Sequence, residues 1–233
     1  MSRMIIPQNI KSLIHEMEES KDRWFALYMS TWGESYRVRD DYRDTDLWEK
    51  PIELGLPASR LKYHVYKPNH LYDILTNRDG EIALNHSQTM FSLIEKLVKE
   101  THKILYPEEK TINTGNRKTL IQFLKGDYPF KKVTEKLLLP EEEHEFILAR
   151  ETRNCVIHNG RQIDGRWLET FSKVRNATCI YKEGFDLTYV VRLPQVEDWH
   201  DLFLKITKRT ENFLQNIPEN IISSPQGPLQ SPS

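Results

Sequence analysis

The chain has few cysteines. Among its 233 residues only Cys155 and Cys179 occur, and neither belongs to a Cys-x-x-Cys pair. This usage does not indicate a disulfide framework. The histidines are scattered without the spacing of metal ligands, and His-Glu-x-x-His, Walker A and Gly-x-Gly-x-x-Gly patterns are all missing. The sequence therefore predicts neither a metal site nor a cofactor site of these kinds.

Long apolar runs are also missing. No segment has the uninterrupted apolar length that a membrane-spanning helix requires, and the first residues lack the apolar core of a signal peptide. Neither sign of charge dominates, because the formal net charge is -1 although charged residues make up 29% of the chain. We therefore expect a soluble protein of the reducing cytoplasm, in which any phosphate-binding surface is local.

What the chain does contain is helical periodicity. Apolar residues recur at three- and four-residue steps in several segments. This spacing predicts helices over about residues 8–30, 85–105, 117–125, 140–159 and 195–216. Gly126 and the Asn159-Gly160 pair suit helix ends. The sequence thus predicts a mainly α-helical protein.

Two segments break this pattern. Residues 34–70 contain three prolines and many aromatic side chains, and the Asp79-Gly80 pair that follows favours a turn. Residues 161–194 contain two β-favouring runs punctuated by glycines, which predicts a small β-hairpin insert. The chain is therefore expected to comprise an irregular α/β N-terminal extension, a helical domain and a disordered tail rich in Pro, Ser and Gln, over residues 1–80, 81–217 and 218–233 respectively.

One segment combines residue types that suit phosphate chemistry. In the string RNCVIHNG, which covers residues 153–160, Arg153 is followed directly by the polar Asn154, and His158 stands five positions after the arginine. The string lies at the C-terminal end of a predicted helix. It resembles the Arg-x(4–6)-His motif of the HEPN superfamily, in which a polar residue usually follows the arginine.

The resemblance extends in architecture over about residues 85–217 and implies a HEPN-like helical bundle. Proteins of this kind cut RNA without a metal ion and often act as toxins or phage-defence effectors. The resemblance further implies a homodimer in which Arg153, Asn154 and His158 of both chains form one cleft, with Asn154 orienting His158 or a phosphate. It also leaves room for a regulatory partner protein.

The chemistry of these residues suits RNA cleavage in its own right. RNA is cut without a metal ion when its own 2′-hydroxyl attacks the phosphorus, which requires a proton acceptor, a proton donor and a cation. Histidine exchanges protons near neutral pH, and the arginine guanidinium donates paired hydrogen bonds to phosphate oxygens. Residues five apart are offset by about 140° on a helix, so Arg153 and His158 do not share a face. Asn154 and His158, four apart, do.

A basic stretch precedes the motif. Between residues 110 and 136 there are seven Lys or Arg residues and two acidic ones. Lys118, Lys125, Lys131 and Lys132 are therefore candidates for contact with an RNA backbone. The same residues also suit the solvated faces of short helices, and the sequence does not decide between the two interpretations.

Three functional interpretations stay open. The first is the endoribonuclease, and the second is a catalytically inert HEPN-like dimer that serves as a binding or scaffold module. The third is an unrelated helical adaptor, in which Arg153 forms an ordinary ion pair and His158 contacts the last carbonyls of its helix. Cys155 is interpreted as a small buried apolar residue rather than a nucleophile.

Overall fold

The computed structural model describes residues 5–50, 52–54, 64–176, 179–191 and 193–217. Most of these residues lie in α-helices, as the sequence predicts. In chain order the elements are α1 (Gln8–Tyr42), β1 (Ile52–Leu54), β2 (His64–Tyr66), α2 (Pro68–Leu105), α3 (Arg117–Lys125), the 3-10 helix η1 (Pro140–Glu142), α4 (Glu143–His158), α5 (Gly165–Arg175), the 3-10 helix η2 (Leu187–Tyr189) and α6 (Leu193–Asn216).

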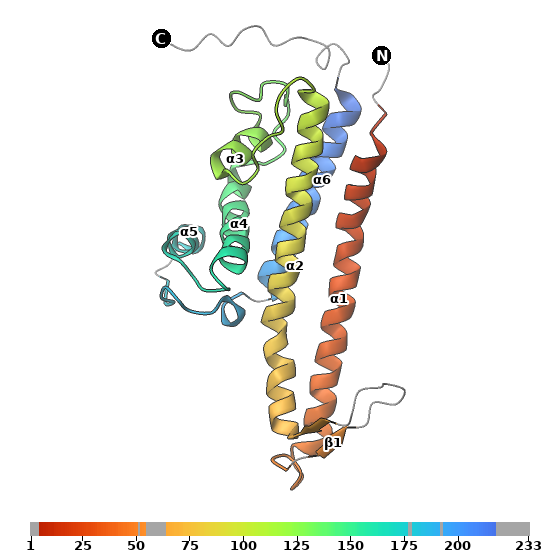
Figure 1. The fold of residues 1–233 in the computed structure, drawn as a ribbon, viewed down its shortest axis with the longest axis vertical. Coiled ribbons are helices and arrows are strands. Elements are labelled where there is room, and N and C mark those ends of the chain that lie inside the picture. Colours follow the sequence, from red (N-terminus) through yellow and green to blue (C-terminus); the bar gives the residue numbers. More distant parts are fainter. Residues whose placement is uncertain (1–4, 51, 55–63, 177–178, 192, 218–233) are drawn as a thin grey trace.

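A long hairpin of α1 and α2 runs the length of the molecule, and α6 lies beside it over the half that is distant from the strands (Figure 1). β1 and β2 pair antiparallel at the tip of the hairpin, with Ile52 opposite Tyr66. The apolar faces of the helices meet in one core, in which Ile10 and Met17 of α1 are almost completely buried. Each such side chain contributes about 1.5–3 kcal/mol of transfer free energy.

Three phenylalanines hold α4 against α2 and α6. The ring centroids of Phe91 on α2 and Phe146 on α4 are 5.4 Å apart, and Phe203 on α6 lies 5.9 Å from the first and 6.0 Å from the second. Both contacts of Phe203 are edge-to-face, which is a favourable arrangement for aromatic rings. This cluster fixes α4 on the side of α2 that faces away from α1 (Figure 1).

The turn predicted at Asp79-Gly80 is wrong, because α2 is continuous from Pro68 to Leu105. A Cβ at position 80 would lie 2.0 Å from the carbonyl oxygen of Thr188, so Gly80 allows η2 to approach the helix closely. A helical glycine costs only about 1 kcal/mol, which packing offsets here. The expected boundary at residue 80 therefore lies inside a helix.

The hairpin predicted for residues 161–194 is also wrong. The described part of this segment contains α5, η2 and one isolated β-bridge instead. Asp164 caps the N-terminus of α5, because its Oδ1 accepts a hydrogen bond from the backbone N–H of Trp167 at 2.9 Å. Asn176 ends the helix in the left-handed conformation. These caps select a helix in a segment whose composition favours strands.

Two predicted helix ends are confirmed, those of α3 and α4, whereas α1 and α2 are longer than the helices predicted over residues 8–30 and 85–105. The Asn116 side chain caps α3, and Gly126 follows that helix in the left-handed region with φ 67°. α4 ends at His158, and Gly160 then adopts a φ of 58°. The expected disordered tail lies outside the described residues. Among the residues that are described, no helix has the length and apolarity to cross a membrane.

Candidate functional site

The motif residues lie in the last two turns of α4, where the sequence predicts them. His158 is the final helical residue and is exposed to solvent. Within the described residues its side chain has neither a hydrogen-bond partner nor an ion-pair partner. The loop after it is held in place, since Asn159 Nδ2 donates to Asp164 Oδ2 at 3.0 Å and the backbone N–H of Arg161 donates to the carbonyl of Cys155 at 3.0 Å. His158 is therefore open to a ligand on an ordered helix end.

Arg153 points to a different neighbour. Its Nη2 lies 3.3 Å from Oε2 of Glu95 on α2, and its Nη1 donates to Asn154 Oδ1 at 3.2 Å. The side chains of Arg153 and Glu95 are 19% and 12% exposed, so the pair is largely shielded from water. Arg153 Nε is buried without a partner among the described residues. One chain therefore does not bring Arg153 and His158 to the same place.

Asn154 connects the motif to the preceding turn. Its Nδ2 donates to Oε2 of Glu151 at 3.2 Å, and Oε1 of Glu151 accepts from Arg150 Nη1 at 2.9 Å. Arg117 of α3 approaches the same carboxylate at 3.8 Å. Glu151 is only 3% exposed, so these cations compensate a buried charge. The carboxylate thereby links the motif to α3.

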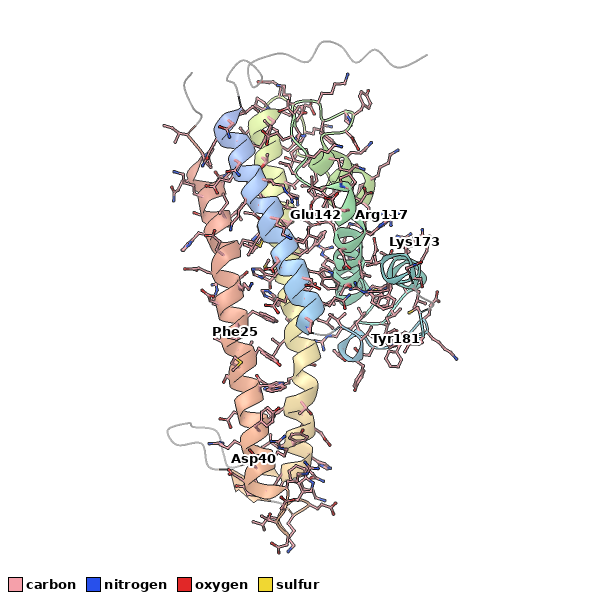
Figure 2. The ribbon with its side chains drawn as sticks, turned by 180° about the vertical axis from the view of Figure 1, so that it is seen from behind. Phe25, Asp40, Arg117, Glu142, Lys173 and Tyr181 are labelled. Atoms are coloured by element: carbon pink, nitrogen blue, oxygen red, sulfur yellow. The ribbon has the colours of Figure 1, made fainter. Side chains whose placement is uncertain are left out.

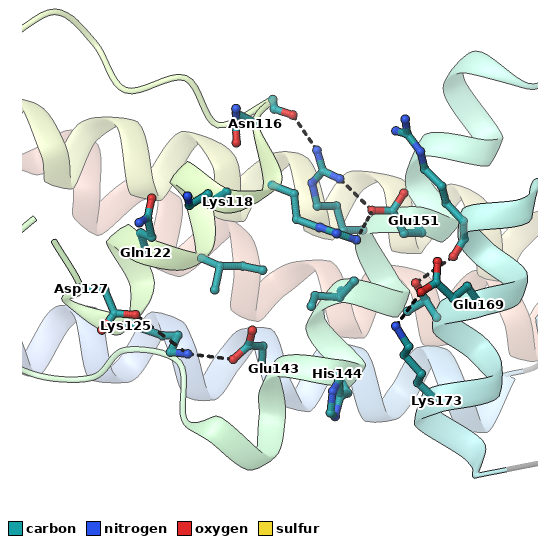
Figure 3. Close-up of a pocket in the computed structure, with 17 residues that line it drawn as sticks. Asn116, Lys118, Gln122, Lys125, Asp127, Glu143, His144, Glu151, Glu169 and Lys173 are labelled. Atoms are coloured by element: carbon teal, nitrogen blue, oxygen red, sulfur yellow. Dashed lines mark hydrogen bonds and ion pairs between the residues drawn. The ribbon is translucent and has the colours of Figure 1, made fainter. Parts of the chain in front are cut away.

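A cleft of about 950 Å³ lies between α3 and α5, with α4 as its floor (Figure 3). It opens on the side of the molecule from which Arg117 and Lys173 project, away from α1 (Figure 2). Its lining includes His144 and four acidic side chains, Asp127, Glu143, Glu151 and Glu169. The six basic residues of the lining are Arg117, Lys118, Lys125, Arg150, Arg166 and Lys173. The cleft is therefore more positive than the chain as a whole.

The acids neutralise the two ends of the cleft unequally. At the end away from the motif, Lys125 Nζ lies 3.0 Å from Glu143, and this hydrogen bond raises the pKa of Lys125. Lys173 Nζ lies 2.6 Å from Glu169, which lowers the pKa of that carboxylate. At the end near the motif, Lys118 and Arg166 are exposed and have no acidic partner within the described part of the chain.

The floor of the cleft continues to the motif histidine. Ile147 and Glu151 line the cleft, and Asn154 and His158 follow them at spacings of three and four residues. Such spacings keep side chains on one helix face. Asn154 and His158 therefore extend the floor beyond the first residues of α3. Arg153 lies on another face, toward α2.

The predicted RNA-contacting lysines separate into two pairs. Lys118 and Lys125 line the cleft. Lys131 and Lys132 do not, and their Nζ atoms instead lie over the rings of Tyr128 and Tyr106, at 5.8 Å and 5.4 Å from the centroids. The sequence interpretation missed two cleft cations of α5, Arg166 and Lys173. Their seven-residue spacing was the available signal, but it is meaningful only in a helix.

Other reactive groups do not contribute to this site. Burial raises the pKa of the Cys155 thiol to about 11, so it stays protonated and is a poor nucleophile, in agreement with its predicted structural role. Cys155 and Cys179 are both free. In the parts of the chain that the structure describes, no group of three or more His, Cys, Asp or Glu residues is placed to hold a metal ion.

No protein-family model matches the chain, and no match was found among curated proteins or solved structures.

Proposed function

We propose that this protein is a HEPN-like, metal-independent endoribonuclease that acts in the cytoplasm as a homodimer. The observation that supports it best is the position of His158. This side chain is exposed, has no partner among the described residues, and stands in line with the floor of a basic cleft. A role as a toxin or phage-defence effector follows from the HEPN resemblance and forms part of the proposal.

The proposed reaction needs only RNA and side chains. The 2′-oxygen of one ribose attacks the adjacent phosphorus, and the bond from phosphorus to the 5′-oxygen of the next nucleotide breaks. His158 removes the proton of the 2′-hydroxyl, and the protonated His158 of the partner subunit gives a proton to the departing 5′-oxygen. The products are a 2′,3′-cyclic phosphate and a 5′-hydroxyl. Arg153 stabilises the charge on the non-bridging oxygens, and Asn154 orients His158.

The homodimer belongs to the proposal because one chain presents Arg153 and His158 on different faces of α4. Apolar surface suited to such a contact lies close to the motif. Ile157, Phe185 and Tyr189 are 41%, 43% and 53% exposed. The last two flank Leu187, whose N–H donates to the carbonyl of Arg161, just after the motif, at 2.9 Å. Burial of these side chains between two copies would bring the two motif helices together.

The test is cleavage of labelled tRNA and total RNA by the purified protein in EDTA. We expect His158→Ala to reduce the rate at least about 100-fold, the usual scale of a lost acid–base catalyst. His15→Ala, which removes an exposed histidine of α1 that pairs with Glu19, is the matched control and should leave the rate unchanged. Product ends should be 2′,3′-cyclic phosphates. Equal cleavage by wild type and His158→Ala would overturn the assignment.

A second function is favoured by the ion pair of Arg153. Since Glu95 already neutralises this guanidinium, the chain also suits a non-catalytic HEPN-like module that binds RNA or serves as a scaffold. The same assay separates the two functions. A wild-type protein that forms a dimer and cuts no RNA tested, with or without EDTA, would support the scaffold.

A further inference from the structure

The walls of the cleft are α3 and α5, which lie on either side of α4 (Figure 3). On one side, Arg117 at the start of α3 meets Glu151, and Lys125 at its end meets Glu143. On the other side, the start of α5 lies near Thr152, whose hydroxyl accepts from Trp167 Nε1 at 2.8 Å. Both N-terminal ends therefore lie at the end of the cleft that is nearer to the motif.

That end is also where the unneutralised cations lie. Lys118 of α3 and Arg166 of α5 line opposite walls of the cleft and have no acidic partner among the described residues. Arg117 shares the buried Glu151 with Arg150 and reaches it only at 3.8 Å. The opposite end holds Lys125 and Lys173 in short ion pairs. The cleft thus presents a gradient of positive charge that rises toward the motif.

The length of the cleft limits what it can bind. Arg117 and Lys125 are eight residues apart, which corresponds to about 12 Å along α3. Stacked nucleotides advance about 3.4 Å each along a strand, so the cleft accommodates about three. Domains that recognise duplex RNA span about 16 base pairs across two minor grooves, a surface much longer than this cleft. A short single-stranded segment is the anionic polymer that matches these dimensions.

We propose that the cleft binds the backbone of about three nucleotides of single-stranded RNA, and that Lys118 and Arg166 bind the phosphates closest to the motif. The position of this segment beside the cleaved bond rests on the proposed nuclease function. Binding itself does not, because it depends on the cleft cations alone. Glu143 at the far end disfavours phosphate there, so the strand is held most tightly at the end nearer to the motif.

The experiment measures binding of a fluorescent 2′-O-methyl octanucleotide by anisotropy, since this ligand has no 2′-hydroxyl and cannot be cut. The test variant is Lys118→Glu with Arg166→Glu. The matched control is Lys110→Glu with Lys136→Glu, which makes the same change in charge at exposed residues outside the cleft. We expect the test variant to weaken binding at least about tenfold. The slope of the logarithm of its binding constant against the logarithm of the salt concentration should become shallower by about 0.7 for each lost phosphate contact. The control should bind nearly as the wild type does.

The outcomes separate this inference from the nuclease proposal. Equal loss of binding in both double variants would show that only the net charge of the protein matters and would overturn the cleft site. Binding by the test variant as tight as that of the wild type would overturn it as well. Cleft-dependent binding by a protein that cuts no RNA would support the cleft and overturn the nuclease. Unchanged cleavage by a Lys118→Glu, Arg166→Glu protein would support the nuclease and overturn the cleft. Circular dichroism of each variant checks that it is folded.

Discussion

Arg153 and Glu95 form an ion pair between α4 and α2, with the guanidinium Nη2 3.3 Å from the carboxylate Oε2. The pair is largely shielded from solvent, and the Nε of the same arginine is buried without a partner within the described residues. The proposed reaction requires this guanidinium to exchange a carboxylate for a phosphate. The ion pair is therefore a structural contact, and Glu95 also competes with the phosphate of the substrate for Arg153.

Glu95→Gln tests this dual role. Removal of the carboxylate leaves a poorly hydrated guanidinium, so we expect the free energy of unfolding to fall by about 1–3 kcal/mol. If Arg153 binds phosphate during cleavage, the same change frees it, and the KM for RNA should fall. Urea denaturation and steady-state kinetics give the two values. A loss of stability with no change in KM would make Arg153 a purely structural residue.

Two helical glycines form a matched pair. Gly80→Ala places a Cβ 2.0 Å from the backbone oxygen of Thr188, so the helix or η2 must shift. Overpacking of this kind costs about 1–3 kcal/mol, and we expect a loss of at least that size. Gly33→Ala meets nothing within 4 Å and should stabilise α1 by about 0.5–1 kcal/mol. Denaturation midpoints measure both, and equal effects at the two positions would contradict the close approach of η2.

Helix ends could be predicted from the sequence where local chemistry determines them. Gly126 follows α3 and Gly160 follows α4, because capping depends on residues within one turn. The continuity of α2 could not be predicted, since the need for Gly80 arises from Thr188, more than a hundred residues later. α5 was missed for a related reason: its β-favouring residues are overridden by its caps and by the packing of Trp167 in the core.

The site was predictable only in part. The motif and its helix could be found from spacing, and the separate faces of Arg153 and His158 follow from helix geometry. The cleft could not, because it requires α3 and α5 to flank α4, and this arrangement depends on long-range contacts such as that of Arg117 with Glu151. For the same reason the sequence could not distinguish Lys118, which lines the cleft, from Lys131, which does not.

A buried histidine pair predicts sensitivity to acid. His86 Nε2 and His200 Nδ1 lie 2.9 Å apart, and Trp24 stacks on His86. Burial lowers the pKa of His86 to about 3 and that of His200 to about 4, from the ordinary value of 6.5. The unfolded chain therefore binds more protons than the folded one below pH 6.5. Stability is complete above that value and decreases as the pH falls toward the folded-state pKa values.

The measurement is the free energy of unfolding as a function of pH between 7.5 and about 4.5. Two such histidines make this free energy change by up to about 2.7 kcal/mol per pH unit. His86→Phe keeps an aromatic ring between Trp24 and His200 and should reduce the slope by about half. His15→Ala, at an exposed position, should leave it unchanged. A slope equal to that of wild type in His86→Phe would show that other groups govern the acid transition.

Dimer formation through the motif end of α4 has a specific consequence for Ile157. This exposed side chain lies four residues after Arg153, on the same helix face. If two copies meet there, Ile157→Asp places a carboxylate in the contact, and sedimentation velocity should show a monomer. This variant should also lose RNA cleavage, because each proposed site needs both chains. Phe25→Asp is the control, since Phe25 is also an exposed apolar residue but lies on α1, away from α4 (Figure 2). A monomeric wild-type protein would contradict the homodimer. A dimer that Phe25→Asp dissociates and Ile157→Asp does not would show that the interface lies away from the motif. Either result would rule out a site shared between two chains.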